Sequence, residues 1–186
     1  VDFEERNALF DEALEVLPLA WSGEAFSYKG RHFEARNVIQ LPRPTQQPIP
    51  IWIGGNSKAS RRRVAEKAQG WMPMIAPEHV GDAIFKTVRT PPPGSPDDVK
   101  AQIAEIREAG RARGAEIDFT MVYLDTTIRD PRRSSAPTRD VARHRDAFAH
   151  QAEAGITWSV VGASHGPPER QRAFIEEFGA TYIARA

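Results

Sequence analysis

The sequence contains no cysteine, has no net charge and lacks any long apolar run. Its 186 residues include 25 Lys and Arg against 25 Asp and Glu. Without cysteine, disulfides, thiolate metal sites and a cysteine nucleophile are excluded. The balanced charge argues against nucleic acid and anionic membranes as partners, because both are bound through an excess of Lys and Arg. No apolar stretch approaches the roughly 18 residues that cross a bilayer, so the composition predicts a soluble, cytoplasmic protein.

The chain begins with Val1 rather than Met and enters a helical pattern almost at once. Apolar residues at near-helical spacing predict an amphipathic helix over residues 3–20, with Asp2 as its N-cap. Pro18 should end or kink this helix, because proline lacks the N–H that continues it. The abrupt start inside a helix favours a chain that is the downstream part of something longer.

A short hairpin and a stiff connection follow. Aromatic residues alternate with turn residues over 21–30, and the apolar run 38–41 completes the pattern of a hairpin outside the main sheet. Residues 42–48 contain three prolines, which predicts an irregular surface connection.

After Pro48 the pattern becomes strand followed by helix, four times. Short, nearly continuous apolar runs are typical of strands buried in a parallel sheet, and each crossover is long enough for parallel strands. Two α/β folds fit: a small open doubly wound sheet, or half of a (β/α)8 TIM barrel, which typically needs about 250 residues. The start inside a helix favours the barrel, with residues 1–186 as its C-terminal half. The predicted strand runs are 49–53, 71–75, 117–124 and 156–161.

The half-barrel reading predicts a row of side chains that face the barrel interior and lack packing partners from the other half. Such a surface predicts self-association, so the chain is expected to be a homo-oligomer. Core packing is the first interpretation for Trp52, Trp71 and Trp158. The side chains expected to face the interior are those of Ile51, Ile53, Met72, Val122, Leu124, Trp158 and Val160.

The main candidate site is the stretch Gly54-Gly55-Asn56-Ser57, where a buried strand delivers two glycines and then a helix start. Glycines allow close backbone approach, and a helix N-terminus offers N–H groups and positive dipole to an anion. The stretch is neither a Walker A loop nor a GxGxxG fingerprint. The alternative interpretation is a plain strand-to-helix turn of the kind that recurs in α/β proteins.

Other candidates are weaker. The run 61–63 of three arginines could extend a phosphate patch, although a charge run on a helix is more often a solvated face. His165 follows the fourth strand, where barrel enzymes place functional residues, but an exposed loop histidine is the commoner explanation. The five histidines have no metal-ligand spacing, so no metal site is predicted.

Several motifs in this order resemble the C-terminal half of the luciferase-like monooxygenase family, particularly its coenzyme F420-dependent oxidoreductases. The motifs are Trp21-Ser22-Gly23, residues 28–33, the stretch 42–55 with its P-x-P-x-Q-x-P pattern ending in Ile-Gly-Gly, and Gly70-Trp71. Where the family usually has Gly-Asp-Gly-Trp, this chain has Gln69 in place of the aspartate. The resemblance implies a (β/α) barrel that binds FMN or F420 at the C-terminal ends of its strands.

The resemblance further implies that Gly54, Gly55, Asn56 and Ser57 lie at the phosphate of the cofactor. The expected activity is hydride transfer between coenzyme F420, or alternatively FMN, and a small organic substrate. No residue is assigned a catalytic role, because the family's first half supplies most of the pocket for the reactive ring. The alternative is a non-catalytic half-barrel or small α/β module that binds a phosphorylated ligand or a partner chain.

Overall fold

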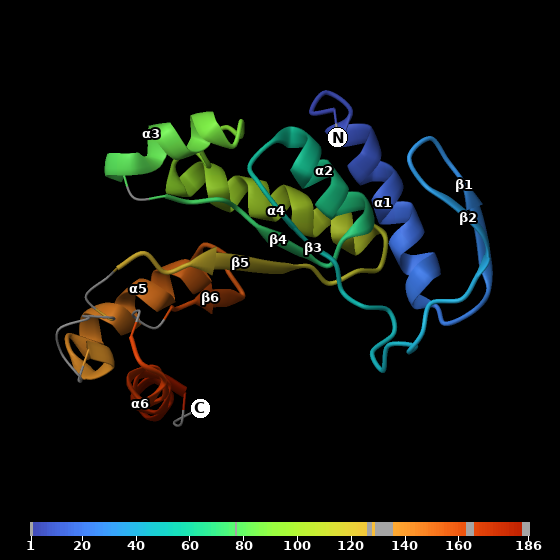
Figure 1. Ribbon diagram of the computed structural model, residues 1–186. Helices are drawn as coiled ribbons and strands as arrows, with labels where there is room; N and C mark the ends of the chain where they lie inside the picture. Colours follow the sequence, from blue (N-terminus) through green and yellow to red (C-terminus); the bar gives the residue numbers. More distant parts are fainter. Residues whose placement is uncertain (1, 77, 126–127, 129–135, 163–165, 184–186) are drawn as a thin grey trace.

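The computed structural model of the chain describes residues 2–76, 78–125, 128, 136–162 and 166–183 (Figure 1). His165 therefore lies outside the described residues. The strands are β1 (Phe26–Lys29), β2 (Glu34–Val38), β3 (Trp52–Gly54), β4 (Gly70–Met72), β5 (Asp118–Val122) and β6 (Trp158–Val160). The α-helices are α1 (Arg6–Trp21), α2 (Lys58–Lys67), α3 (Glu78–Thr87), α4 (Pro96–Ala112), α5 (Val141–Glu153) and α6 (Pro168–Phe178). A 3₁₀ turn spans Ala136–Thr138, and a π-helical turn, Gly179–Ile183, continues α6.

The four later strands form one parallel sheet in the order β3-β4-β5-β6. Each strand therefore pairs with the next one along the chain, as successive strands do in a (β/α) barrel. An open doubly wound sheet would instead reverse its strand order at a switch point. The sequence prediction of an α/β fold with parallel strands is confirmed.

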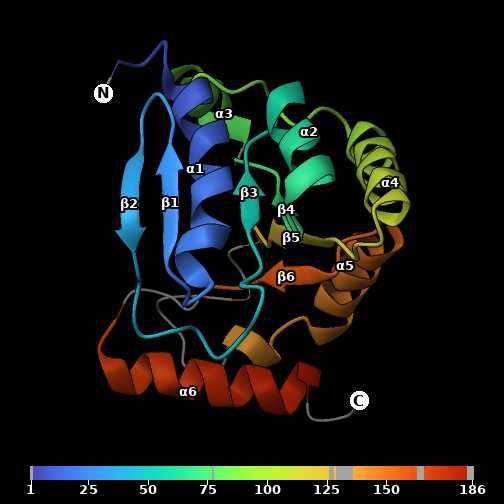
Figure 2. The ribbon, with the colours of Figure 1, turned by 90° about the vertical axis from the view of Figure 1, so that its right-hand side faces the viewer.

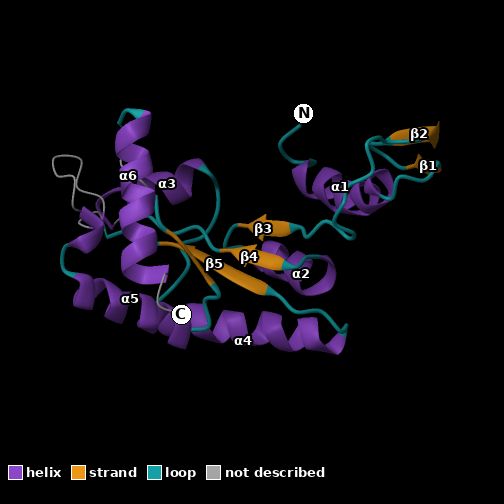
Figure 3. Cartoon of the chain, turned by 90° about the horizontal axis from the view of Figure 1, so that it is seen from below, coloured by secondary structure: helices purple, strands orange, loops and turns teal. Residues whose placement is uncertain are grey.

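The core lies between this sheet and helices α2 and α4, which Figure 3 shows on one side of the strands. Trp71 and Phe119 point into it from β4 and β5, and neither is exposed to solvent. Val64 of α2 and Ile103 of α4 pack against them in the same cluster. Because α2 and α4 also contact each other directly, this side of the sheet is a closed two-layer core.

The facing of the first strand differs from the prediction. Ile53 is 3% exposed and belongs to the core on the helix side, and Ile51 packs against the same core, so the placement of both in the barrel interior was wrong. Trp52 and Trp158 lie on the opposite, inner face and are 37% and 57% exposed, so core packing holds only for Trp71. A run of three apolar residues contains no alternation that could have told the two faces apart.

Helix α1 and the hairpin lie side by side at one end of the molecule (Figures 1 and 2). The N-cap of α1 is Glu5 rather than Asp2, whose carboxylate instead accepts a hydrogen bond from the Glu4 N–H at 2.9 Å. Pro18 lies within the last turn of α1, and the helix ends at Trp21. The hairpin is confirmed, although its second strand begins at Glu34, earlier than the apolar run suggested.

Helix α4 begins with a complete capping box at the sequence Ser-Pro-Asp-Asp. The Ser95 hydroxyl accepts from the Asp98 N–H at 3.2 Å, and the Asp98 carboxylate accepts from the Ser95 N–H at 2.9 Å. In the described part of the chain, no helix is long and apolar enough to cross a membrane.

Candidate functional site

The four predicted residues form one continuous turn at the carboxyl end of β3. Gly54 is the last residue of that strand, and Ser57 is the N-cap of α2. The turn thus lies at the edge of the parallel sheet where (β/α) enzymes build their sites. The structure brings all four residues together at the start of one helix.

The two glycines differ in what they do. Gly55 has φ of +95°, a conformation that strains any residue with a Cβ, and an added Cβ would also lie 3.2 Å from the Ser60 Oγ. At Gly54, by contrast, an added Cβ would make only ordinary contact with the Met72 carbonyl oxygen, at 3.7 Å. Gly55 is therefore the residue on which the shape of the turn depends.

The backbone groups of Gly55 tie the turn to β4. Its N–H donates to the Met72 carbonyl at 3.2 Å, and its own carbonyl accepts from the Trp71 Nε1–H at 2.9 Å. The Gly55 N–H is consequently engaged within the protein. A ligand at this turn would have to use donors further along the chain.

Asn56 is 2% exposed, and its side chain holds neighbouring loops in place. The Nδ2 group donates to the carbonyls of Met74 and Pro91, both at 2.9 Å, while Oδ1 accepts from the Met74 N–H at 2.8 Å. The Asn56 N–H donates to the Thr90 Oγ1 at 3.2 Å. Both amide protons of the side chain are used, so Asn56 shapes the site without a side-chain donor to offer an anion.

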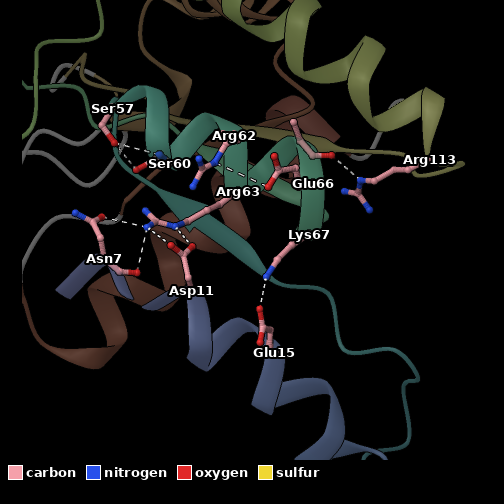
Figure 4. Close-up of polar contacts among 11 residues, drawn as sticks. Asn7, Asp11, Glu15, Ser57, Ser60, Arg62, Arg63, Glu66, Lys67 and Arg113 are labelled. Atoms are coloured by element: carbon pink, nitrogen blue, oxygen red, sulfur yellow. Dashed lines mark hydrogen bonds and ion pairs between the residues drawn. The ribbon is translucent and has the colours of Figure 1, made fainter. Parts of the chain in front are cut away.

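Ser57 begins α2 and forms a hydroxyl pair with Ser60 (Figure 4). Its Oγ accepts from the Ser60 N–H at 3.1 Å and lies 3.0 Å from the Ser60 Oγ. One hydrogen bond between two hydroxyls uses one of their two protons, so the pair retains a proton for a third group. The N–H groups of Lys58 and Ala59, in the first turn of α2, have no acceptor within the helix.

The three successive arginines of α2 serve three different purposes. Arg61 donates to the Asn56 carbonyl at 2.6 Å, which places its positive charge at the turn. Arg62 is exposed and lies 3.9 Å from Glu66. Arg63, with a side chain only 6% exposed, points away from the turn toward α1. The interpretation of this run as a solvated face therefore holds for Arg62 and is wrong for Arg63.

Arg63 joins α2 to α1 by a two-pronged ion pair with Asp11 (Figure 4). Its Nε and Nη2 lie 2.5 and 3.0 Å from the two carboxylate oxygens, and Nη2 also donates to the Asn7 carbonyl at 3.2 Å. The hydrogen bond from Arg63 lowers the pKa of the Asp11 carboxyl below its usual value, against the opposing effect of burial. Lys67 adds an exposed ion pair to Glu15 at 3.0 Å.

A groove of about 840 Å³ lies on the outside of the helix layer, between α2 and α4. Lys58 and Arg61 reach one end of it, and Arg113 borders it from the end of α4. None of the four turn residues lines this groove. The groove is thus a feature of the helix surface, and the chemistry of the candidate site resides in the turn itself.

A buried Tyr–His pair beyond the end of β5 went unnoticed at the level of sequence. The Tyr123 hydroxyl lies 2.7 Å from the Nδ1 of His144, which is fully buried on α5. Burial lowers the pKa of His144 and raises that of Tyr123. His144 falls at a helix position with no motif around it, and only the distance to Tyr123 identifies the pair.

The comparisons with known proteins concern the family and the fold of the chain. Residues 1–91 match the family described as luciferase-like monooxygenase, and this segment includes the whole turn at 54–57. This match identifies residues 1–91 as a segment of the luciferase-like monooxygenase type. An uncharacterized protein of Mycobacterium tuberculosis is 32% identical over 121 residues, which cover 63% of this chain and 35% of that protein. The chain therefore matches about a third of this relative's length.

Solved structures show the same fold at low sequence identity. An F420-dependent secondary alcohol dehydrogenase, in complex with an F420–acetone adduct, superposes with a TM-score of 0.64 at 14% identity. The match covers 97% of this chain and 62% of that enzyme. A riboflavin lyase with modified FMN gives a TM-score of 0.60 at 11% identity over 96% of this chain and 57% of that one. The chain thus has the fold of part of a luciferase-like barrel.

Proposed function

We propose that this chain supplies the phosphate end of the cofactor site in an F420- or FMN-dependent oxidoreductase. The reaction would transfer hydride between the cofactor and a small organic substrate. The observation behind the proposal is the turn at Gly55 to Ser57, which leads a parallel strand into the N-terminus of α2 within the family-matched segment. Glycine, a helix N-terminus and a nearby cation together favour a phosphate.

The residues present fit a phosphate group at this place. The N–H groups of Lys58 and Ala59 and the remaining hydroxyl proton of the Ser57–Ser60 pair are donors without acceptors inside the helix. Lys58 and Arg61 add positive charge near the same end of α2. A side chain in place of the hydrogen at Gly55 would crowd Ser60, which accounts for the glycine.

When bound, the deazaflavin or flavin ring supplies the hydride chemistry, and the protein positions the ring and excludes water. In this proposal, α2 anchors one end of the cofactor, while Asn56 keeps the anchoring turn rigid through its bonds to Met74 and Pro91. F420 is the first choice of cofactor, because the Trp21-Ser22-Gly23 and 54–57 stretches resemble the F420-dependent branch. One solved structure of the same fold contains F420 and another contains modified FMN, so FMN is the second choice.

The proposal is tested by titrating the protein with F420 and with FMN and measuring the affinities by calorimetry. We expect F420 to bind more tightly than FMN and Gly55→Val to weaken binding at least about tenfold, the equivalent of about 1.4 kcal/mol. Gly114→Val is the matched control, because Gly114 also has a positive φ, +72°, but an added Cβ there meets no neighbour. Equal affinity of the Gly55→Val variant and the control would contradict the phosphate assignment, and tighter FMN binding would reverse the choice of cofactor.

Competition by inorganic phosphate distinguishes the proposed cofactor site from the alternative function, a non-catalytic module. A non-catalytic module for phosphorylated ligands would bind phosphate at the same turn but show no preference for F420 or FMN over other phosphate esters. We expect phosphate to compete with the cofactor only weakly, because it lacks the ring. Competition as strong as that by the cofactor itself would favour the alternative.

We also propose that the protein self-associates through the inner face of its sheet. More than a third of the surface is exposed for each of five apolar side chains there: Met72, Val122, Leu124, Trp158 and Val160. An exposed apolar surface of this kind favours association. Sedimentation velocity should show a concentration-dependent increase in mass, whereas a monomer at all concentrations would contradict this proposal.

A further inference from the structure

A cavity lies between the start of α4 and the end of α5, on the helix side of the parallel sheet. Figure 3 shows both helices on the same side of the strands. The volume of the cavity is about 300 Å³. None of the four residues of the turn at 54–57 lines it, so this cavity is separate from the proposed phosphate site.

The walls of the cavity are mostly apolar. Val99 of α4 and Ile156, just before β6, are 6% and 7% exposed and belong to the core, and the half-buried Met121 of β5 packs against that core. An apolar cavity of about 150 Å³ already excludes water and holds benzene, so the space here suits a somewhat larger molecule. The apolar residues used in this argument are Ile75, Pro93, Val99, Met121 and Ile156.

Contacts between α4 and the end of α5 fix the width of the cavity. The Arg107 Nη2 group of α4 donates to the Gly155 carbonyl at 3.0 Å. A Cβ added to Gly155 would lie 2.9 Å from the Cγ2 of Ile103, so the backbone at Gly155 packs directly on α4. Ala154, the residue before this contact, lines the cavity, and its small side chain leaves the space open.

Gln151 of α5 brings a hydrogen-bond donor to these apolar walls. The Ser159 hydroxyl of β6 donates to its Oε1, which fixes the orientation of the amide. In the described part of the chain its Nε2 group makes no hydrogen bond, so both protons remain available. The other polar residue that lines the cavity is His150, which is exposed. A few placed polar groups in an apolar pocket orient a ligand and select its chemistry.

We propose that this cavity binds a small, uncharged aryl carbonyl compound, whose carbonyl oxygen accepts a hydrogen bond from the Gln151 Nε2 group. The ring packs on Met121 and Ile156, and a thioether beside an aromatic ring is a favourable contact. Burial of the ring supplies the affinity, and the hydrogen bond supplies the orientation. The ligand is uncharged because no Lys, Arg, Asp or Glu is among the residues that line the cavity, and an unpaired charge there would be unfavourable.

Acetophenone is the probe, and the methionine methyl groups of the 186-residue chain report where it binds. The chain has three methionines: Met121 lines the cavity, and Met72 lies on the opposite face of the sheet with 39% of its surface exposed. In carbon–proton NMR spectra, we expect acetophenone to shift the Met121 signal saturably, with a Kd of about 1 mM or lower, and to leave the Met72 signal in place. The variant Met121→Leu assigns the signal. A saturable shift of Met72 in place of Met121, or of neither, would overturn the inference.

Two substitutions on α5 test the cavity itself. Ala154→Leu fills the space and should weaken acetophenone binding at least about tenfold. Ala152→Leu is the matched control, because Ala152 is exposed on the same helix, and it should leave the affinity unchanged. Circular dichroism shows whether both variants fold. Equal affinities of the two folded variants would overturn the inference, as would a loss of self-association in Ala154→Leu without acetophenone binding to the unsubstituted chain, which would make the cavity a contact between copies.

A second pair of ligands tests the hydrogen bond, and it does not depend on how Ala154→Leu folds. α-Methylstyrene has the shape of acetophenone with a methylene group in place of the carbonyl oxygen. Gln151→Leu should weaken acetophenone binding about tenfold relative to α-methylstyrene, because the oxygen loses its donor. An unchanged ratio of the two affinities would show an unselective apolar cavity and would overturn the carbonyl assignment.

This inference stands apart from the proposed cofactor function. Gly55→Val should leave acetophenone binding unchanged, since the turn does not line the cavity. If neither F420 nor FMN binds but acetophenone shifts Met121, the cavity assignment stands and the cofactor function is wrong. If Gly55→Val weakens acetophenone as strongly as Ala154→Leu does, the ligand occupies the turn and the cavity assignment is wrong.

Discussion

The two faces of the parallel sheet differ sharply although the same short strands supply both. Trp71 and Met72 are neighbours on β4, yet the first is fully buried and the second is 39% exposed. The helix-side face packs against α2 and α4, whereas the inner face carries exposed apolar side chains, among them Met72, Val160 and the contacting pair Trp52 and Trp158. The helix-side face therefore contributes most of the burial that stabilises the fold, and the inner face is accessible to ligands or to further protein. The predictions below test that division.

The largest effect is expected from Trp71→Ala, on the helix side. Loss of a fully buried tryptophan should lower the free energy of unfolding by about 3–5 kcal/mol, from lost burial and the cavity left behind. Trp158→Ala, on the inner face, should change it by less than about 1 kcal/mol. Urea unfolding monitored by circular dichroism measures both. Similar losses in the two variants would show that the inner face is part of the core.

The second effect concerns the ion pairs on the helix side of the sheet. Asp11→Ala leaves the Arg63 guanidinium buried without its carboxylate. We expect a loss of about 2 kcal/mol, less than the roughly 3–5 of wholly buried pairs because Asp11 is partly solvated. Arg62→Ala, on the solvent side of the same helix, should change stability by less than about 0.5 kcal/mol. Equal effects in thermal unfolding would contradict the separate roles of the two arginines.

A smaller effect is expected at the helix start that borders the candidate site. Ser57→Ala removes the N-cap of α2 and should cost about 1 kcal/mol in chemical unfolding. Ser95→Ala removes the equivalent cap of α4 and should cost a similar amount. Only the first variant should also weaken cofactor binding in calorimetry. A matching loss of binding in Ser95→Ala would mean that overall stability, and not the turn, governs affinity.

The smallest effect concerns the pH dependence of stability. Burial lowers the pKa of His144 in the folded state, although the Asp125 carboxylate opposes this and Arg143 reinforces it. The unfolded chain then binds the proton more readily, so the contribution of His144 is complete above about pH 6.5 and is lost as the pH falls below it. Unfolding in urea at pH 7.5 and 5.5 should show this loss, reduced in His144→Gln. The same pH dependence in that variant would place its origin elsewhere.

The sequence predicted the order of strands and helices because the signals are local. The Ser-Pro-Asp-Asp start of α4 and the apolar runs of the strands each lie within a few residues. The face of the sheet on which each side chain lies could not be predicted, because every residue in Ile51-Trp52-Ile53 is apolar. Only the packing of α2 decides that Ile53 faces the helices. The effect of Pro18 was also not predictable from the sequence, because the helix continues past this proline to Trp21.

The candidate site was predictable in position and less so in detail. Two glycines before a helix marked the turn, and Gly55 has the positive φ that such a turn requires. The partners of Asn56 lie 18 and 35 residues further along the chain, at Met74 and Pro91, so no local pattern could reveal that its side chain is engaged.

The fork from Arg63 to α1 has a consequence for how the molecule opens. Among the residues of helix α1, Leu14 is the buried one, and Arg63 and Lys67 of α2 add ion pairs to Asp11 and Glu15. Segments with few buried apolar contacts and many polar ones open at a lower free energy than the core. We therefore expect helix α1 and the adjoining hairpin to open at a lower free energy than the parallel sheet and its helices.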